Sequence, residues 1–197
     1  MTRAFVLGNG TSRRDISVPA LKSLGQIYGC NALYREFTPD VLVATDQPIA
    51  TAIQDSGYAQ NNKFYTRRPT AGTGARSLLA EYRGYSSGPN ALGLAARQGN
   101  LEIYMLGFDM GPTENNLFNN VYADTEFYKT SAHPPTFVGN WVRQVIHVFR
   151  DHPQAQFTRV YGPTTARIAE LDLVPNLEHI DLAIFMDRMI NKKDQAT

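Results

Sequence analysis

The sequence predicts a single α/β domain with a mostly parallel sheet and helices on both faces of it. Three observations lead to this prediction. Short apolar runs rich in β-branched and aromatic residues recur along the chain and end at turn residues, and amphipathic helical stretches lie between them. The 197 residues, of which 43% are hydrophobic, are also enough for one domain with a substantial core.

Six apolar runs have the length and composition of strands. Each contains β-branched or aromatic residues and stops at a glycine or a polar residue. They span residues 4–7, 27–30, 41–44, 64–66, 102–106 and 157–161. We expect these six runs to form the whole sheet.

Apolar residues at three- and four-residue spacing predict three helices. They span residues 48–55, 89–97 and 140–150. In the third helix, Trp141, Val145, Val148 and Phe149 form an apolar stripe. Residues 177–190 are apolar nearly all round, and their pattern fits either a buried helix or a strand followed by a helix.

A long segment without a helix or strand pattern separates the fifth strand from the third helix. Residues 107–135 are rich in Asn, Thr, Gly, Pro and aromatics, whereas loops have a median length of about 4–6 residues. We therefore expect a functional loop that forms a lid over a site. The domain is expected to span residues 1–190, with a flexible tail over residues 191–197.

The charge balance argues against a nucleic-acid partner, because the net charge is only +1 and no run of four like charges occurs. No apolar run approaches the roughly 18 residues of a transmembrane helix, and the apolar part of residues 1–10 is too short for a secretory signal. Cys30 is the only cysteine, so no internal disulfide can form. We expect a protein of the reducing cytoplasm.

The first candidate binding element is the segment Gly8-Asn9-Gly10-Thr11-Ser12, directly after the first strand. Parallel sheets bind ligands at the carboxyl ends of their strands. Two glycines let a phosphate approach the backbone, and the Asn, Thr and Ser side chains supply neutral hydrogen-bonding groups. A plain turn with a helix cap at Thr11 or Ser12 is the alternative. The Walker pattern is absent, and Arg13 breaks the Gly-x-Gly-x-x-Gly pattern.

Further polar residues stand at other strand ends and at a helix start. Asn31 follows the second strand and Asp46 the third, so both are expected at the sheet edge of the first loop, in a cradle for base, ribose and phosphate. Ser86, Ser87 and Gly88 open the second helix, where free N–H groups and the helix dipole favour an anion. Each has an ordinary alternative as a turn former or helix cap.

Two residues of the long loop region are candidate catalytic groups. His133 lies in a polar, Pro-rich stretch, where an exposed imidazole can act as a general base near neutral pH. The phenol of Tyr122 can donate a hydrogen bond to a departing phosphate. A surface histidine and an aromatic packing residue are the alternatives. No histidine pair has a metal-ligand spacing with a Cys or carboxylate, so no metal site is expected.

Four blocks of the sequence, taken in order, resemble the bacterial sialyltransferases that build lipooligosaccharide. They are Val6-Leu7-Gly8-Asn9-Gly10-Thr11-Ser12, Cys30-Asn31-Ala32-Leu33-Tyr34, Ser86-Ser87-Gly88 with residues 91–99, and Glu102-Ile103-Tyr104-Met105-Leu106-Gly107-Phe108-Asp109. The match covers roughly two thirds of the chain, and the block from residue 86 to residue 109 is the most specific.

The resemblance implies a Rossmann-like glycosyltransferase fold, a CMP-linked sugar donor, a glycan acceptor, an inverting reaction and no cofactor or metal requirement. Asn9 and Asn31 correspond to the family's nucleotide-contacting asparagines, and residues 86–88 to its phosphate- and sugar-contacting loop. His133 takes the place of the general base. Tyr122 takes the place of one of two tyrosines that stabilise the leaving phosphate.

The chain departs from this family at two places. The second family tyrosine falls on Gly111, two residues after Asp109, which is itself expected at the donor site. The stretch over residues 46–86 is shorter than in the family and carries basic side chains that would meet an acidic acceptor or a donor carboxylate. These are Arg67, Arg68 and Arg76.

A second group shares the Gly-x-Gly-x-Ser loop and the Gly-x-Asp block, namely the archaeal-type hydroxymethylpterin pyrophosphokinases and the motility-associated glycosyltransferase-like proteins. Under the pyrophosphokinase alternative, the arginines hold a triphosphate and Asp46 or Asp109 carries Mg²⁺. A non-catalytic nucleotide-binding protein of the same fold is a further alternative. The sialyltransferases often form tetramers, so a homo-oligomer is open, and the apolar C-terminal segment offers an interface. Residues 180–190, followed by Lys192-Lys193, fit a peripheral membrane contact, but the stretch lacks a clean polar face, which favours packing on the sheet.

Overall fold

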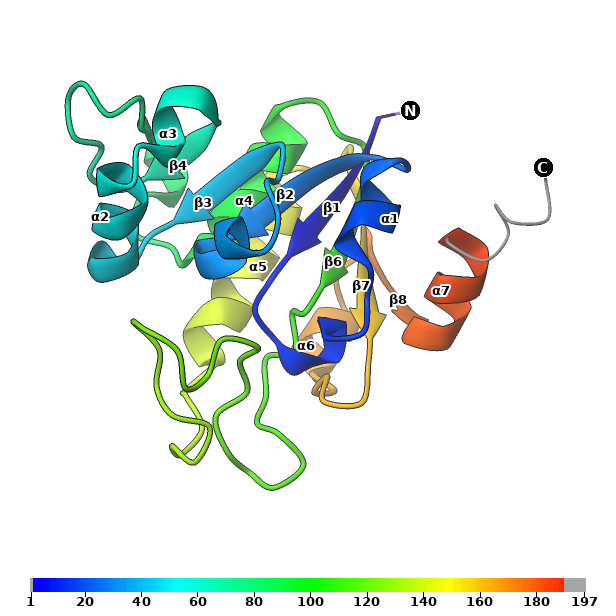
Figure 1. Cartoon of the computed structure of the whole chain (residues 1–197). Coiled ribbons are helices and arrows are strands. Elements are labelled where there is room, and N and C mark those ends of the chain that lie inside the picture. Colours follow the sequence, from blue (N-terminus) through cyan, green and yellow to red (C-terminus); the bar gives the residue numbers. More distant parts are fainter. Residues whose placement is uncertain (1, 190–197) are drawn as a thin grey trace.

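The computed structural model describes residues 2–189. Its centre is one sheet in the order β5-β4-β3-β2-β1-β6-β7-β8, in which every neighbouring pair runs parallel (Figure 1). The strands are β1 (Arg3–Leu7), β2 (Gln26–Cys30), β3 (Val41–Ala44), β4 (Phe64–Thr66), β5 (Arg76–Ser77), β6 (Glu102–Leu106), β7 (Gln156–Tyr161) and β8 (Leu177–Asp181). The predicted parallel α/β fold is confirmed.

Helices cover both faces of the sheet, as predicted. They are α1 (Val18–Lys22), α2 (Gln47–Asp55), α3 (Tyr58–Asn61), α4 (Ser87–Arg97), α5 (Gly139–Asp151), α6 (Ala169–Asp172) and α7 (Leu182–Met189), with 3-10 turns η1 (Thr11–Arg13), η2 (Asn31–Arg35) and η3 (Ala80–Tyr82). On one face, α4 and α5 bury Leu92 and Val145. On the other, α2 and α7 bury Ile53 and Phe185.

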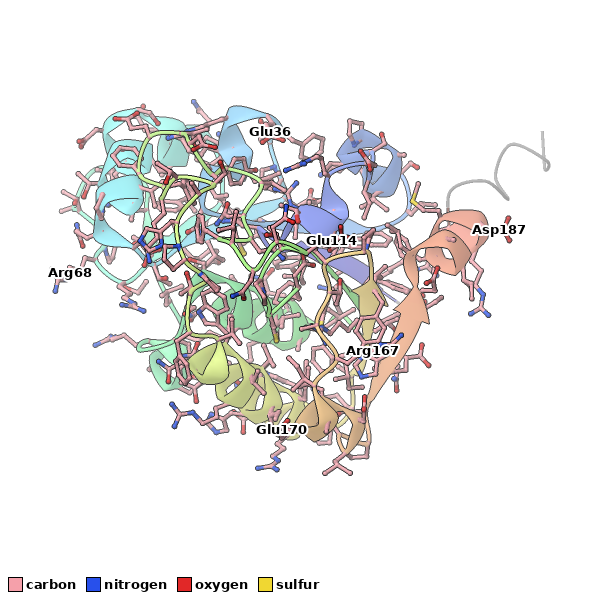
Figure 2. All side chains as sticks on the ribbon, turned by 90° about the horizontal axis from the view of Figure 1, so that it is seen from below. Glu36, Arg68, Glu114, Arg167, Glu170 and Asp187 are labelled. Atoms are coloured by element: carbon pink, nitrogen blue, oxygen red, sulfur yellow. The ribbon has the colours of Figure 1, made fainter. Side chains whose placement is uncertain are left out.

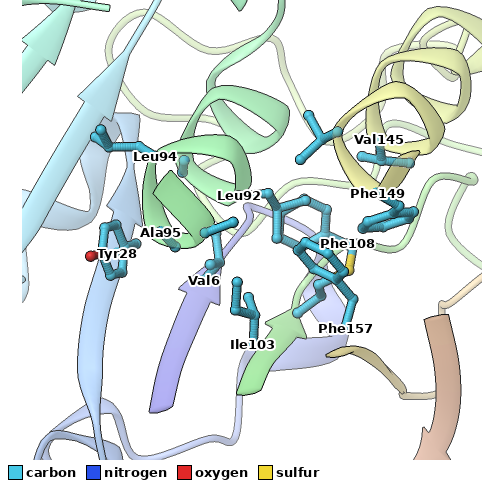
Figure 3. Packing of buried hydrophobic residues seen from close by; sticks show 14 of the residues in the cluster. Val6, Tyr28, Leu92, Leu94, Ala95, Ile103, Phe108, Val145, Phe149 and Phe157 are labelled. Atoms are coloured by element: carbon cyan, nitrogen blue, oxygen red, sulfur yellow. The ribbon is translucent and has the colours of Figure 1, made fainter. Parts of the chain in front are cut away.

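The central strands contribute alternate side chains to these two cores. In β1, Val6 packs under α4, whereas Phe5 packs on the opposite face. Figure 3 shows Val6 close to α4, and the rings of Phe149 and Phe157 lie 4.6 Å apart between α5 and β7. A sheet that is covered on both faces needs apolar residues at consecutive positions, which explains why its strands appear in the sequence as continuous apolar runs.

The structure corrects the expectation that six strands complete the sheet. All six are present, but β5 and β8 extend the two edges. Of the segment predicted over residues 177–190, residues 177–189 form a strand, β8, followed by a helix, α7, and residue 190 lies outside the described residues. The short helices α1, α3 and α6, of four or five residues each, were not predicted because one turn carries too little periodicity.

The segment between β6 and α5 has no helix or strand over residues 107–138, in agreement with the predicted long loop over residues 107–135. The predicted tail over residues 191–197 lies outside the described residues. Among residues 2–189, no helix combines the length and the apolar character that crossing a membrane requires.

Candidate functional site

A cavity of about 420 Å³ lies at the carboxyl ends of β1, β2, β3 and β6, under the long loop. This position is the topological switch point of the sheet, because the chain continues from β1 to β2 on one side and reaches β6 on the other. Most of the predicted donor-site residues line it together. They are Gly8, Asn9, Gly10, Asn31, Asp46, Ser86, Ser87, Gly88 and Asp109.

The two glycines of the first loop are required by the close approach of two backbones. A Cβ on Gly8 would lie 2.5 Å from the carbonyl oxygen of Gly107, and one on Gly10 would lie 2.4 Å from Cγ of Asp109. The N–H of Gly10 donates to the carbonyl of Gly107 at 2.8 Å. The loops after β1 and β6 therefore form one continuous cavity floor.

Asp109 lines the cavity, but its carboxylate is used within the protein. The side chain is 3% exposed and accepts hydrogen bonds from the backbone N–H of Ser12 (3.0 Å) and from its hydroxyl. It also accepts from the hydroxyls of Thr164 (2.7 Å) and Thr165 (3.2 Å), and from the amide of Asn119 (3.1 Å). The predicted donor-site residue Ser12 is thus a buried partner of Asp109 and does not line the cavity.

A second hydrogen-bonded group joins β2, β3 and α4. The hydroxyl of Ser87 donates to Oδ1 of Asn31 at 2.8 Å and accepts from the N–H of Thr45 at 3.0 Å. Asn31 has a positive φ of 54°, a conformation in which Asn is tolerated better than most residues. These bonds fix the start of α4 over the strand ends.

The start of α4 presents unpaired donors to the cavity. The N–H of Ser86 donates to the side chain of Gln144 at 2.9 Å, whereas those of Ser87 and Gly88 have no acceptor within residues 2–189. A Cβ on Gly88 would approach the ring of Phe108 to 3.0 Å, so the glycine allows the helix start to lie against this ring. Free N–H groups and the helix dipole together favour an anion here.

Asn9 carries an acceptor without a partner. Its Oδ1 is buried, and no donor within the described residues reaches it, although its backbone carbonyl accepts from Val121 at 2.8 Å. Buried polar atoms are rarely left unpaired, so this oxygen is a candidate for a ligand contact. Asp46, by contrast, is exposed at the start of α2, and its carboxylate makes no capping bond.

Tyr122 is a buried residue of the long loop and does not line the cavity. It is 4% exposed, and its hydroxyl accepts a hydrogen bond from Nη2 of Arg13 at 2.8 Å. Burial raises its pKa to about 12, against the opposite effect of Arg13, so the phenol stays protonated. Its ring packs against Tyr128 with 5.5 Å between centroids. Tyr122 therefore matches the alternative given above, an aromatic packing residue.

His133 stands behind the cavity wall. Its Nδ1 lies 2.8 Å from the carbonyl oxygen of Pro134, and its ring packs against Phe118, which lines the cavity, with 6.4 Å between centroids. The half-buried imidazole is therefore one side chain away from the cavity.

The three arginines and Thr11 also lie outside the cavity lining. Arg67 donates to the carbonyl of Tyr85 at 2.9 Å, and Arg76 stacks on the ring of Tyr65. Figure 2 shows Arg68 at the edge of the molecule. Thr11 borders a separate, smaller hollow on the outer side of the loop.

Apart from Tyr128, whose phenol the sequence offers beside Tyr122 as a donor to a departing phosphate, the sequence did not predict the aromatic wall that the long loop and α5 add to the cavity. Its members are Phe108, Phe118, Phe127, Tyr128 and Trp141. Phe127 has a positive φ of 73° although it is bulky, and such backbone strain clusters at ligand sites. The aromatic content of the loop was the available signal, but sequence alone does not say which rings turn inward.

Comparison of the sequence with protein-family models and with curated proteins finds no match. A solved structure of the MAf glycosyltransferase from Magnetospirillum magneticum AMB-1 is similar to this chain, with a TM-score of 0.52 and 16% sequence identity. The similarity covers 91% of this chain and 33% of that one, so this chain spans about a third of the length of its structural relative. At this identity, the similarity establishes a shared Rossmann-like fold.

Proposed function

We propose that this cavity binds a nucleotide-activated sugar and that the chain is a glycosyltransferase-like domain that transfers the sugar to a glycan acceptor. One observation carries the proposal: a switch-point cavity that joins the unpaired N–H groups of Ser87 and Gly88 to the unpaired Oδ1 of Asn9. A phosphate suits the first pair, and an N–H or hydroxyl group of the nucleoside suits the second. The fold shared with a glycosyltransferase supports the same function.

The proposed donor is CMP-linked and reacts with inversion, without a metal. His133 takes the proton of the acceptor hydroxyl, whose oxygen attacks the anomeric carbon while the bond to the phosphate oxygen breaks. The departing phosphate is stabilised at the start of α4. Tyr122, whose hydroxyl accepts a hydrogen bond from Arg13, anchors the long loop to the segment after β1.

The placement of Asp109 and of the three arginines favours the sugar donor over the pyrophosphokinase alternative, whereas Asp46 lines the cavity with a carboxylate that makes no capping bond. That alternative assigns Mg²⁺ to Asp46 or Asp109, and the carboxylate of Asp109 is already engaged by five hydrogen bonds. It also assigns the triphosphate to Arg67, Arg68 and Arg76, none of which lines the cavity.

Isothermal titration tests the proposal. The protein is titrated with CMP, CDP, UDP, GDP, ATP and GTP, in Mg²⁺ and again in EDTA. Selective binding of CMP or CDP that is unchanged in EDTA supports it, whereas ATP or GTP binding that needs Mg²⁺ favours the pyrophosphokinase. Nucleotide binding without transfer or donor hydrolysis, across a broad acceptor panel, would support the non-catalytic alternative.

The variant Asn9→Ala tests whether the nucleotide binds in this cavity. It removes the unpaired Oδ1 and is expected to weaken CMP binding by up to about tenfold. Arg68→Ala, at the edge of the molecule, is the control and is expected to leave binding unchanged. Equal affinities of all three proteins would move the ligand away from this cavity.

A further inference from the structure

Two arginine side chains are buried beneath the cavity. Arg13 in η1 is 5% exposed, and Arg159 in β7 is fully buried. Burial of a guanidinium group is costly unless it is paired, and such groups are normally found with a carboxylate. Neither arginine forms an ion pair within residues 2–189.

Both guanidinium groups bond instead to backbone carbonyls of the cavity floor. Arg13 donates from Nε to the carbonyl of Gly8 at 2.6 Å. Arg159 donates to the carbonyls of Phe108 and Asp109, each at 2.9 Å. All three carbonyls belong to residues that line the cavity. Because these carbonyl oxygens accept hydrogen bonds from the guanidinium groups below the floor, their partial negative charges point away from a ligand above it.

Arg13 lies directly against the floor. A Cβ on Gly107 would be 3.0 Å from its Cδ and 3.1 Å from its Cγ. Its charge also reaches Cys30, another lining residue: burial raises the pKa of this thiol to about 12, and Arg13 acts in the opposite direction. Arg13 is therefore close enough to Cys30 to act on the thiol of a lining residue.

The nearby acidic groups do not balance this charge. The carboxylate of Asp109 is the buried acid beneath the floor, and it is bonded to hydroxyl and N–H groups. Glu36, which interacts with the hydroxyl of Tyr122, is exposed to solvent and so is screened. Asp46, which lines the cavity, and Asp172, which attracts Arg159, are likewise exposed to solvent and screened. Within residues 2–189, two buried cations at the floor thus face one buried carboxylate, and in a weakly screened interior they make the floor electropositive.

We propose that Arg13 is a positioning residue that, together with Arg159, makes the floor of the cavity selective for a phosphate group. The phosphate accepts hydrogen bonds from Ser87 and Gly88, while Arg13 stabilises it from below without touching it. This inference rests on the proposed nucleotide site and adds that the phosphate, more than the nucleoside, determines affinity.

Titrations of cytidine, CMP and inorganic pyrophosphate, all in EDTA, test the inference. The proteins are wild type, Arg13→Gln, Arg13→Lys and Arg14→Gln. Arg14→Gln removes the same charge one residue away, where the side chain is exposed and outside the cavity lining. We expect Arg13→Gln to weaken CMP and pyrophosphate binding by about tenfold and to leave cytidine binding unchanged. Arg13→Lys should retain most of the affinity, and Arg14→Gln all of it.

An equal loss for CMP and cytidine in Arg13→Gln would indicate a structural role and overturn the inference, as would no loss for either. In the wild-type protein, equal affinities for CMP and cytidine would overturn the phosphate site and leave the nucleotide site standing. This comparison tests the inference even if the Arg13 variants do not fold. Binding of pyrophosphate without CMP or cytidine would retain the phosphate site and overturn the proposed function. No binding of any probe would overturn both.

Discussion

The side chain of Asn119 accepts two hydrogen bonds from Thr11, one from the backbone N–H and one from the hydroxyl, each at 2.8 Å. Asn119 belongs to the long loop and Thr11 follows β1, so the bonds connect segments that are 108 residues apart. The N–H of Val121 adds a bond to the carbonyl of Asn9 at 2.8 Å. This part of the loop is therefore anchored to the segment after β1 and forms a wall of the cavity that the long loop covers, as predicted.

Asn119→Ala is expected to loosen this wall. The N–H of Thr11 would lose its acceptor, at a cost of about 1–3 kcal/mol in the free energy of unfolding. Hydrogen exchange at residues 117–123 should become faster. Asn115→Ala, at an exposed position of the same loop, is the control and should change neither quantity. Unchanged exchange in Asn119→Ala would show that other contacts hold the loop.

The sheet was largely predictable because its central strands are buried on both faces. β3 is buried at all four positions, and such runs stand out in a sequence. The edge strands could not be predicted in this way. β5 has two exposed residues, and β8 has only two aliphatic residues, Leu and Ile, among Glu, His and Asp. Their strand character depends on the neighbour with which they pair, which the local sequence does not contain.

The cavity floor was predictable for a similar reason, since the carboxyl ends of parallel strands meet at one edge. That rule placed Asn9, Asn31 and Asp46 correctly around one cavity. It gave no information on Tyr122 or Arg13, whose burial depends on how the long loop packs across β1. The resemblance supplied a role for Tyr122, but the structure places this phenol behind the cavity.

The Gly-x-Gly segment provides a stability prediction. Gly8→Ala would bring a Cβ to 2.5 Å from the carbonyl oxygen of Gly107, and backbone atoms cannot move aside cheaply. We expect a loss of about 1–3 kcal/mol or more in urea unfolding. Gly84→Ala, where a Cβ meets nothing within 4 Å, should change stability by less than about 0.5 kcal/mol. If Gly8→Ala were as stable as the wild-type protein, the loops after β1 and β6 would have to move apart at little cost.

Asp109→Asn tests whether the Gly-x-Asp block acts in folding. The amide would present an N–H₂ group to the donors of Ser12, Thr164 and Thr165, so some of these bonds must be lost. The expected cost is about 3 kcal/mol in the free energy of unfolding. Asp187→Asn, at an exposed position of α7, should have no measurable effect. A stable Asp109→Asn protein that fails to bind nucleotide would instead assign this carboxylate to the ligand.

The stability of the protein should fall as the pH decreases below 6.5. Burial lowers the pKa of His152 in the folded chain from its usual 6.5, and this outweighs the attraction of Asp151. Below pH 6.5 the unfolded chain binds a proton that the folded chain does not, so the free energy of unfolding decreases until the folded pKa is passed. Burial also lowers the pKa of His179, so this residue contributes to the same loss of stability.

Urea unfolding at a series of pH values between about 5 and 8 measures this slope. In His152→Gln the decrease between pH 6.5 and about pH 5 should become smaller, and the contribution of His179 should remain. Asn115→Ala, at an exposed position of the long loop, removes no titratable group; it is the control and should keep the wild-type slope. The same slope in His152→Gln would assign the pH dependence to other groups.

His133→Ala separates catalysis from binding. In the proposed reaction the imidazole removes the proton of the acceptor hydroxyl, so its loss should reduce sugar transfer by about 100-fold or more while the affinity for CMP stays unchanged. His147→Ala removes an exposed imidazole of α5 that contacts Tyr85 and lies outside the cavity lining, and it should leave transfer intact. His133 does not line the cavity and its ring packs against Phe118, which does, so the proposed role requires that this ring moves or that the acceptor binds at the rim. Full transfer activity in His133→Ala would therefore remove His133 from the mechanism and leave the proton to water or to the departing phosphate.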